Sequence, residues 1–422
     1  MARGEASGTP AKSVCRYKRS AGGAVFLRAD ASSVMTGMTL VSIAAGQPAE
    51  PSTRTLFRPG AVSSAMAPVP AHLREYEETY VTDPQQAAIE WFEDARYGLF
   101  LHYGLYSLLA NHEWVQYHEA IPPEEYALLQ QHFTADGFDA SAIASFAKDA
   151  GMRYINITTK HHDGFCLFES DQTTYSSVHA PAGRDLVAEL AAACRDEGLG
   201  FFCYYSIGID WRHPHAPNRE DWGQPARPDY ADRPGIYADA GHELDRYLQY
   251  VEQQCLELLS YEPAGIWFDP AVFSQLPGKA GWDPAPFELP RLYETIREHS
   301  PGTLISFKDG VTGTEDFLAP ELYYEAHGEN SNRPGEICAC MLPGAEYEGE
   351  IRHSWGYLAE GSGKHKSEEE VCKLLNEAGE NGFNLLLNTG PLPDGSLDPE
   401  DTRVLRAVGD RLEREGFPDG GK

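Results

Sequence analysis

Short apolar runs alternate with amphipathic helical patterns along most of this chain, and this alternation restricts the fold more than any other feature of the sequence. Each run is rich in bulky residues and short enough to be a buried strand. The stretches between the runs repeat apolar residues at helical spacing. The expected strands are 97–102, 153–159, 200–206, 264–269, 303–307 and 383–388, with a further short run at 322–324.

Several of the expected helices carry start and stop signals. Asp139 is placed to cap a helix that Gly151 closes. Ser367 and Glu370 have the spacing of a capping box before another helix. The remaining helical patterns cover 186–194, 244–258, 289–296 and 404–412.

Regular alternation of strands and helices predicts a parallel α/β sheet. About eight strand-helix units within ~340 residues predict a closed (β/α)8 TIM-like barrel. An open doubly wound sheet is the alternative, but no GxGxxG loop follows the first expected strand, which disfavours its nucleotide-binding form. We therefore expect a single catalytic domain over residues 76–422.

Residues 1–75 differ in composition from the rest of the chain. Up to residue 70 the sequence holds eight Lys and Arg against three Asp and Glu, a net +5, which leaves −35 for the remainder of the total of −30. Low complexity without amphipathic period predicts a disordered extension. Two origins stay open: a targeting segment around residues 38–45, or a start assigned too early, with the true beginning near Met66.

The charge and the cysteines exclude several classes of protein. A net charge of −30 disfavours binding to nucleic acid or to anionic membranes. No apolar stretch approaches the ~20 residues needed to span a bilayer. The eight cysteines are scattered at apolar positions without a CxxC pair, so they are expected to be reduced core residues, which favours a cytoplasmic location over secretion.

Four consecutive expected strands end in side chains that can do chemistry. Catalytic groups of a parallel barrel lie at these C-terminal ends. The ends carry His102, then His161 and His162, then Tyr204, then Asp269, while Trp114 lies in the loop after the first strand. Hydrogen-bonding groups beside flat aromatic faces suit a sugar.

Asp269 ends the most apolar of these strands. Burying an unpaired carboxylate costs several kcal/mol, so we expect this side chain at the mouth of a site. A turn or cap aspartate before Pro270 is the alternative. If strand geometry continued through His161 and His162, their side chains would point to opposite sides.

A metal-dependent hydrolase is a competing interpretation because the chain has fifteen histidines. Zinc hydrolases usually present HxH or HExxH motifs. HExxH is absent, and the HxH sequence at His213 and His215 lies in a proline-rich loop instead of at the end of the first strand. We therefore expect no metal and no cofactor.

A set of short segments carries a resemblance to a known family, and the most specific is Lys-His-His-Asp-Gly-Phe at 160–165. The segments are 100–107, 113–114, 159–165, 204–206, 210–211, 266–269, 354–357, 384–388, 390–391 and 394–395. In collinear order, from about residue 87 to 415, the chain resembles the α-L-fucosidases of glycoside hydrolase family 29.

The resemblance implies a retaining exo-glycosidase on a (β/α)8-like barrel, without a metal, acting on fucosylated oligosaccharides or glycoconjugates. It assigns Asp269 as nucleophile and Glu321 as acid/base, because Glu321 closes a segment of the form Asp-Phe-x-x-x-Glu; Glu336 is the alternative. We expect Asp269 to be ionised, and Glu321 to lie in drier surroundings or closer to another negative charge, either of which would keep its proton. The positions that match fucose-binding residues are His102, Trp114, His161, His162 and Tyr204.

Two positions depart from the family pattern. Lys308 stands where the family usually has an arginine near the nucleophile, and lysine cannot form the same planar fork. Gly335 replaces a tryptophan. We include Lys308 among the substrate-binding candidates. These departures motivate a second hypothesis, a catalytically inactive carbohydrate-binding barrel; a third is a glycosidase for a related L-sugar.

Overall fold

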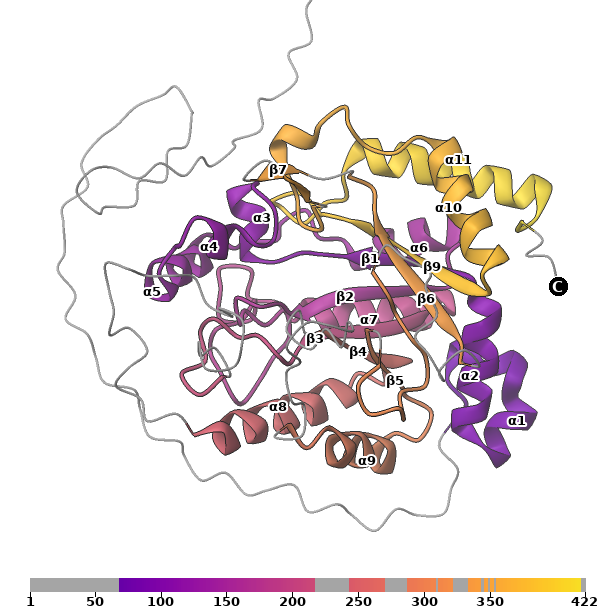
Figure 1. Ribbon diagram of the computed structural model, residues 1–422, viewed down its shortest axis with the longest axis horizontal. Helices are drawn as coiled ribbons and strands as arrows, with labels where there is room; N and C mark the ends of the chain where they lie inside the picture. Colours follow the sequence, from indigo (N-terminus) through magenta and orange to yellow (C-terminus); the bar gives the residue numbers. More distant parts are fainter. Residues whose placement is uncertain are drawn as a thin grey trace, which may run out of the picture.

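A parallel sheet forms the centre of the molecule. The computed structural model describes residues 68–216, 243–269, 287–308, 310–321, 333–342, 345–347, 350–352 and 354–418. The seven strands of the sheet run in the order β5-β4-β3-β2-β1-β9-β6, and each pairs in parallel with its neighbours (Figure 1). They are β1 (Tyr97–Leu101), β2 (Tyr154–Lys160), β3 (Gly200–Ser206), β4 (Gly265–Asp269), β5 (Leu304–Phe307), β6 (Gly335–Cys340) and β9 (Phe383–Thr389).

The two edge strands, β5 and β6, are both linked to residues 317–321. Parallel bridges join Phe317 to Ser306 of β5, and Leu318 to Gly335 and Glu321 to Cys338 of β6. The backbone N–H of Ala319 donates to the carbonyl of Lys308 at 2.7 Å. This curled arrangement of strands is consistent with a (β/α)8-like fold.

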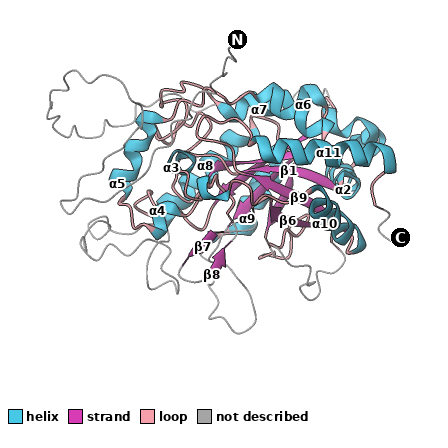
Figure 2. Ribbon diagram, turned by 90° about the horizontal axis from the view of Figure 1, so that it is seen from above, coloured by secondary structure: helices cyan, strands magenta, loops and turns pink. Residues whose placement is uncertain are grey.

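Helices surround the strands. Figure 1 shows α8 and α9 on one side of the sheet and α10 and α11 on the opposite side, and Figure 2 shows α6, α7 and α11 along its length. The helices are α1 (Glu77–Thr82), α2 (Pro84–Ala95), α3 (Leu105–Leu109), α4 (Val115–His118), α5 (Pro123–Tyr126), α6 (Ala140–Asp149), α7 (Leu186–Glu197), α8 (Leu244–Leu259), α9 (Leu289–His299), α10 (Glu368–Glu380) and α11 (Pro399–Glu415). Short 3-10 turns lie at Ala71–Tyr76, Ala127–His132 and Ala359–Gly361, and β7 (Ala345–Tyr347) pairs antiparallel with β8 (Glu350–Arg352). None of these helices is long and apolar enough to cross a membrane.

The core has two parts because successive strand residues face opposite sides of the sheet. One part packs the sheet against the surrounding helices. The other lies inside the curled sheet, where Trp91 and Phe92 of α2 contact inward rings from the strands. Phe92 lies 4.2 Å from Phe317, and Trp91 stacks on Phe202 at 6.2 Å, measured between ring centroids. Helix α2 therefore fills the N-terminal end of the sheet interior.

Gly335 is explained by a close approach. A Cβ atom at this position would lie 1.4 Å from ring atoms of Phe383, the first residue of the neighbouring strand β9. The Phe383 ring occupies the space that a side chain at residue 335 would need. The presence of glycine at residue 335 is therefore required by the position of the Phe383 ring.

Most expected elements are confirmed to within one or two residues, including the Asp139 cap and the Ser367–Glu370 capping box. Three differences stand out. Helical structure begins at Ala71, before the expected domain boundary at residue 76, and Leu73 packs into the core. Strand β6 and helix α2 were not expected. The run at 322–324 and residues 1–67 lie outside the described residues.

Candidate active site

A cavity of about 140 Å³ lies at the C-terminal ends of the strands. It collects groups from β1, β3, β4 and β6 and from the loops that follow the strands, as expected for a parallel barrel. All eight residues predicted from the sequence line it: His102, Trp114, His161, His162, Tyr204, Asp269, Lys308 and Glu321.

Asp269, the last residue of β4, is held by three neighbouring side chains. The Tyr204 hydroxyl donates to its Oδ2 at 2.5 Å, the Lys308 ammonium lies 3.1 Å from its Oδ1, and His162 Nε2 lies 3.7 Å from Oδ2. Burial alone would raise the pKa of Asp269, but the Lys308 ammonium and the Tyr204 hydrogen bond hold it below its usual value. The pKa therefore agrees with the expectation that Asp269 is ionised, because its charge is compensated on both oxygens.

Lys308 links Asp269 to the second carboxylate, Glu321. Its Nζ lies 2.9 Å from Glu321 Oε2, so one ammonium contacts both acids. The two contacts, 3.1 and 2.9 Å, limit the separation of the contacting oxygens to 6.0 Å at most. The backbone of Lys308 has a positive φ of 33°, a strained conformation for a residue with a side chain, of the kind that occurs at functional sites.

Of the two surroundings expected for Glu321, the drier one is wrong. The Glu321 side chain is 33% exposed, whereas that of Asp269 is 9% exposed. Glu321 can therefore exchange protons with solvent, while Asp269 is shielded from it. The second negative charge is present, because Lys308 contacts both acids and so keeps an oxygen of Glu321 within 6.0 Å of an oxygen of Asp269.

The buried histidines of the cavity are arranged as neutral hydrogen-bonding groups. His102 Nδ1 contacts the Asn388 amide oxygen at 2.7 Å, and the amide nitrogen of Asn388 donates to the carbonyl of Trp355. His102 Nδ1 therefore carries the proton and Nε2 is an acceptor. Burial lowers the pKa of His102 to about 3.

His162 is fixed in the same way from another strand. Its Nδ1 contacts Ser206 Oγ at 2.7 Å, and this hydroxyl donates its own proton to the carbonyl of Ile209. Nδ1 of His162 is thus the donor, and Nε2 faces the cavity as an acceptor. Burial lowers the pKa of His162 to about 4.

The expectation that His161 and His162 point to opposite sides is wrong. Strand β2 ends at Lys160, after a register shift between Thr158 and Lys160, so the alternation of side chains stops before the two histidines. Their ring centroids lie 4.1 Å apart, and both side chains line the cavity. Nδ1 of His161 is buried and has no hydrogen-bond partner among the residues that the structure describes.

The cavity also contains residues that we did not predict as site residues, chiefly Glu113 and Trp355. Glu113 Oε2 accepts the backbone N–H groups of Trp355 and Gly356, both at 2.9 Å, and thereby joins two loops at the rim. Burial raises the pKa of Glu113 to about 7. Both residues lie in segments that carried the family resemblance, but neither ends an expected strand. Phe100, Trp267 and Cys338 complete the lining.

Glu336, the alternative acid/base, lies inside the sheet and does not line the cavity. Its carboxyl group accepts the Trp267 indole N–H at 3.1 Å and the hydroxyl of Tyr154. Burial raises the pKa of Glu336 from 4.5 to about 7, so at mild pH this residue is a neutral hydrogen-bonding group of the core. Of the two glutamates, Glu321 lines the cavity and Glu336 does not.

The raised pKa of Glu336 predicts a pH-dependent cost in stability. Between pH 4.5 and about 7 the folded protein keeps a proton that the unfolded chain has released, so the free energy of unfolding falls as pH rises. The pKa difference corresponds to on the order of 3 kcal/mol. Glu336→Gln keeps an acceptor for the Trp267 indole N–H, can donate its NH2 to the Tyr154 oxygen, and removes the titration. The free energy of unfolding of the variant, measured with denaturant, should therefore rise relative to that of the wild type across this range. Parallel pH curves for the two proteins would contradict the assignment.

Among the described residues, no three His, Cys, Asp or Glu side chains are grouped so that they could hold a metal ion. The histidine pair at His213 and His215 has ring centroids 5.8 Å apart, and neither residue lines the cavity.

Comparisons with known proteins agree on one family. The family model described as Alpha-L-fucosidase matches residues 64–417. Alpha-L-fucosidase isoenzyme 1 from Paenibacillus thiaminolyticus has a TM-score of 0.68 at 34% identity, over 79% of this chain and 77% of that chain. Alpha-L-fucosidase AlfC from Lactobacillus casei, solved with α-L-fucose product, has a TM-score of 0.64 at 28% identity, over 78% and 98% of the two chains. The plasma alpha-L-fucosidase of Homo sapiens is 26% identical over 370 residues, 82% of this chain and 72% of the human protein.

Proposed function

The chain belongs to the α-L-fucosidase family of glycoside hydrolases, and from this membership we propose that it releases terminal α-L-fucose from fucosylated oligosaccharides or glycoconjugates with retention of configuration. Asp269 is the nucleophile and Glu321 the acid/base. We also infer that residues 317–321 act as the eighth strand of a closed (β/α)8 barrel, since they bridge β5 and β6.

One observation carries the mechanistic part of the proposal, namely the shared contact of both carboxylates with Lys308. It limits the separation of the contacting oxygens to 6.0 Å. Retaining glycosidases place their two carboxyl groups about 5–5.5 Å apart, whereas inverting enzymes need about 6.5–9.5 Å to admit a water molecule. The geometry thus supports double displacement over single displacement.

In the first step an oxygen of Asp269 attacks the anomeric carbon of fucose while the bond from that carbon to the leaving oxygen breaks. Glu321 gives its proton to the leaving oxygen, so the aglycone departs as a neutral alcohol. The product of this step is a fucosyl ester of Asp269. The Tyr204 hydroxyl, 2.5 Å from Asp269 Oδ2, orients the attacking carboxylate.

In the second step water attacks the anomeric carbon, Glu321 takes a proton from this water, and Asp269 leaves as a carboxylate. Lys308 contributes differently to the two steps. While Asp269 is ionised, the ammonium is shared between its carboxylate and the protonated carboxyl group of Glu321. Once Asp269 is esterified, Lys308 faces Glu321 alone and stabilises its ionised form, which suits Glu321 to act as a base.

The remaining cavity residues suit the uncharged hydroxyls and ring of a fucose. Neutral His102 and His162 present ring nitrogens as acceptors, and Nδ1 of His161 is unpartnered within the described part of the chain. Trp114 offers an aromatic face beside His162, with ring centroids 5.0 Å apart. The Lactobacillus casei relative has been solved with α-L-fucose product and, as a variant, with Fucα(1,6)GlcNAc, which supports a terminal fucose as the recognised group.

A panel of aryl glycosides tests this proposal. We expect release of the aryl group from the α-L-fucoside, at a kcat/KM at least about tenfold above that for the α-L-galactoside, which differs only by a hydroxyl on C6, because a pocket that is lined for one sugar discriminates on this scale. NMR should show α-L-fucose as the first anomer formed. Release of β-L-fucose first would refute retention. Fucose binding without release would favour the inactive binding barrel, and preference for another L-sugar would favour the third hypothesis.

A further inference from the structure

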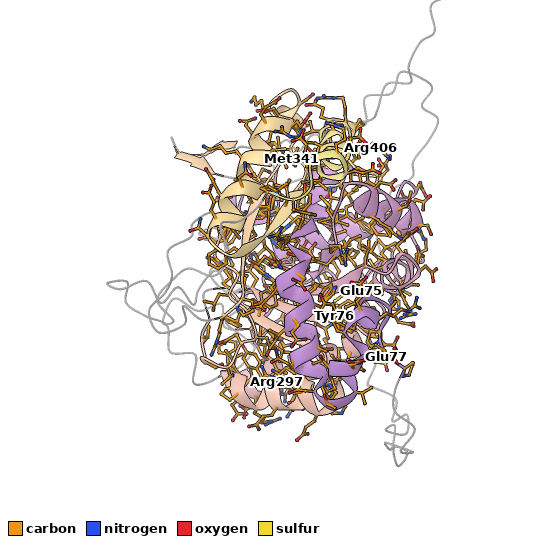
Figure 3. The ribbon with its side chains drawn as sticks, turned by 90° about the vertical axis from the view of Figure 1, so that its right-hand side faces the viewer. Glu75, Tyr76, Glu77, Arg297, Met341 and Arg406 are labelled. Carbon is orange, nitrogen blue, oxygen red and sulfur yellow. The ribbon has the colours of Figure 1, made fainter. Side chains whose placement is uncertain are left out.

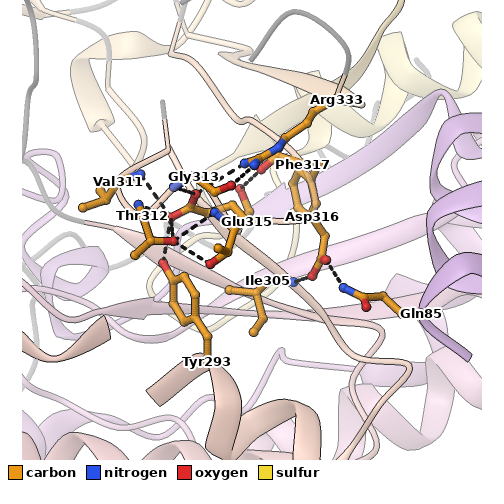
Figure 4. A network of polar contacts seen from close by, with 12 residues as sticks. Gln85, Tyr293, Ile305, Val311, Thr312, Gly313, Glu315, Asp316, Phe317 and Arg333 are labelled. Carbon is orange, nitrogen blue, oxygen red and sulfur yellow. Dashed lines mark hydrogen bonds and ion pairs between the residues drawn. The ribbon is translucent and has the colours of Figure 1, made fainter. Parts of the chain in front are cut away.

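The Asp-Phe-x-x-x-Glu segment contains two residues for which the proposed mechanism gives no role. Glu321 closes the segment, but Asp316 and Phe317 open it and do not line the cavity. Both are buried, with exposed fractions of 7% and 1%. Figure 4 shows Asp316 within a network of polar contacts that connects the loop after β5 to its surroundings.

Asp316 binds the backbone of β5 as a neighbouring strand would. Its backbone N–H donates to the Ile305 carbonyl at 2.8 Å, and its side-chain Oδ2 accepts the Ile305 N–H at 2.7 Å. Side chains from two helices also contact the carboxylate. Gln85 of α2 donates to Oδ1 at 2.5 Å, and Arg297 of α9, labelled in Figure 3, lies 3.3 Å from the same oxygen.

Glu315 shapes the turn immediately before Asp316. Its carboxylate accepts the backbone N–H groups of Val311, Thr312 and Gly313 at 2.9 to 3.0 Å. Burial would raise the pKa of Glu315, but these backbone hydrogen bonds lower it below its usual value. The loop that leaves Lys308 is therefore folded back so that the chain re-enters beside β5 at Asp316.

The register of residues 316–321 determines where Glu321 points. Phe317 and Ala319 belong to the apolar cluster inside the sheet, so alternate residues face inward and Glu321 is the next in that series. Backbone contacts from Lys308 to Ala319 and from Cys338 to Pro320 continue the same register. A slip by one residue would turn Glu321 away from Lys308 and Asp269.

We propose that Asp316 is a positioning residue for the reaction: by holding the Ile305 backbone, it sets the register that delivers Glu321 to the nucleophile. The inference rests on the proposed role of Glu321 and adds a residue that never touches the substrate. Phe317 supports the same register through its contact with Phe92 at 4.2 Å. Loss of Asp316 should therefore weaken acid catalysis selectively instead of lowering all rates equally.

The test compares kcat/KM for phenyl and dinitrophenyl α-L-fucosides, because only the phenyl leaving group depends strongly on protonation. We expect Asp316→Ala to lower kcat/KM for the phenyl fucoside by about tenfold or more, and kcat/KM for the dinitrophenyl fucoside by less than about threefold. The loss with the phenyl fucoside is a part of the ~10²- to 10⁴-fold that acid catalysis contributes. Asp316→Asn keeps an acceptor for Ile305 but loses the charge opposite Arg297, so it should show a smaller loss of the same selectivity.

Asp185→Ala is the matched control. This aspartate also accepts two backbone N–H groups, those of Ala188 and Glu169, at 2.8 and 2.9 Å, and it does not line the cavity. It should leave the ratio of the two kcat/KM values unchanged. If Asp316→Ala does not fold, the ratio for Asp316→Asn decides.

Two outcomes separate this inference from the function on which it rests. Glu321→Ala is measured first with the same two substrates. If Glu321→Ala is selective for the phenyl fucoside and the Asp316 variants lower both substrates equally, or neither, the positioning role is refuted while the function stands. If Glu321→Ala itself is not selective, the proposed acid/base fails.

Discussion

Replacing Asp269 by asparagine is expected to lower kcat/KM for every α-L-fucoside by roughly four orders of magnitude or more, the scale on which loss of a catalytic nucleophile acts. The amide cannot form the ester intermediate. Tyr204, Lys308 and His162 surround the carboxylate, and the substitution retains all three. The cavity should therefore keep its shape. Fucose affinity, measured by calorimetry, should therefore change by less than about tenfold, or ~1.4 kcal/mol.

Azide provides a stereochemical control at Asp269, with a second variant. In Asp269→Ala the small anion can occupy the space of the carboxylate and attack an activated fucoside directly. The expected product is β-L-fucosyl azide, with inverted configuration. Undiminished hydrolysis by Asp269→Asn, or an azide product of retained configuration from Asp269→Ala, would remove Asp269 from the nucleophilic role.

The second large effect is expected at Glu321. Glu321→Ala should lower kcat/KM for phenyl and natural fucosides by roughly 10²- to 10⁴-fold, because a poor leaving group needs the proton that Glu321 supplies. Dinitrophenyl fucoside leaves without protonation, so its kcat/KM should fall by less than about tenfold by the same argument. Stopped assays with both substrates measure the difference.

Azide again distinguishes the roles. In Glu321→Ala the ester with Asp269 still forms, and azide attacks its anomeric carbon from the side where the Glu321 carboxyl group was. The expected product is α-L-fucosyl azide, with retained configuration. An equal loss with both substrates and no azide product would show that another group is the acid/base.

The sequence predicted the strands and the site well where one physical rule applied. Short apolar runs bounded by breakers located β1 to β5 and β9, and the rule that parallel strands converge at their C-terminal ends brought His102, Tyr204 and Asp269 together in advance. The family resemblance, not periodicity, supplied Glu321.

Other features depend on contacts that a sequence pattern does not contain. Strand β6 was missed because its sequence, Gly-Glu-Ile-Cys-Ala-Cys, contains a glutamate at an interior position. The buried carboxyl group of Glu336 is stabilised by hydrogen bonds from Tyr154 and Trp267, which the sequence pattern does not reveal. Residues 317–321 were not recognised as a strand-like segment because their pairing is set by the side chain of Asp316.

The two wrong expectations in the site have similar causes. The directions of His161 and His162 depend on a register shift in β2, which periodicity cannot reveal. The surroundings of Glu321 depend on how far the Lys308 side chain reaches across from β5.

The central claim is that Asp269 becomes covalently fucosylated, and trapping this intermediate tests it most directly. A fucosyl fluoride with a second fluorine beside the anomeric carbon slows the hydrolysis step more than it slows formation of the ester. After incubation with the wild-type protein and proteolysis, mass spectrometry should locate the added sugar on the peptide that ends β4, at Asp269. A sugar attached to a different residue, or rapid turnover to 2-deoxy-2-fluoro-β-L-fucose with no labelled peptide, would contradict the account.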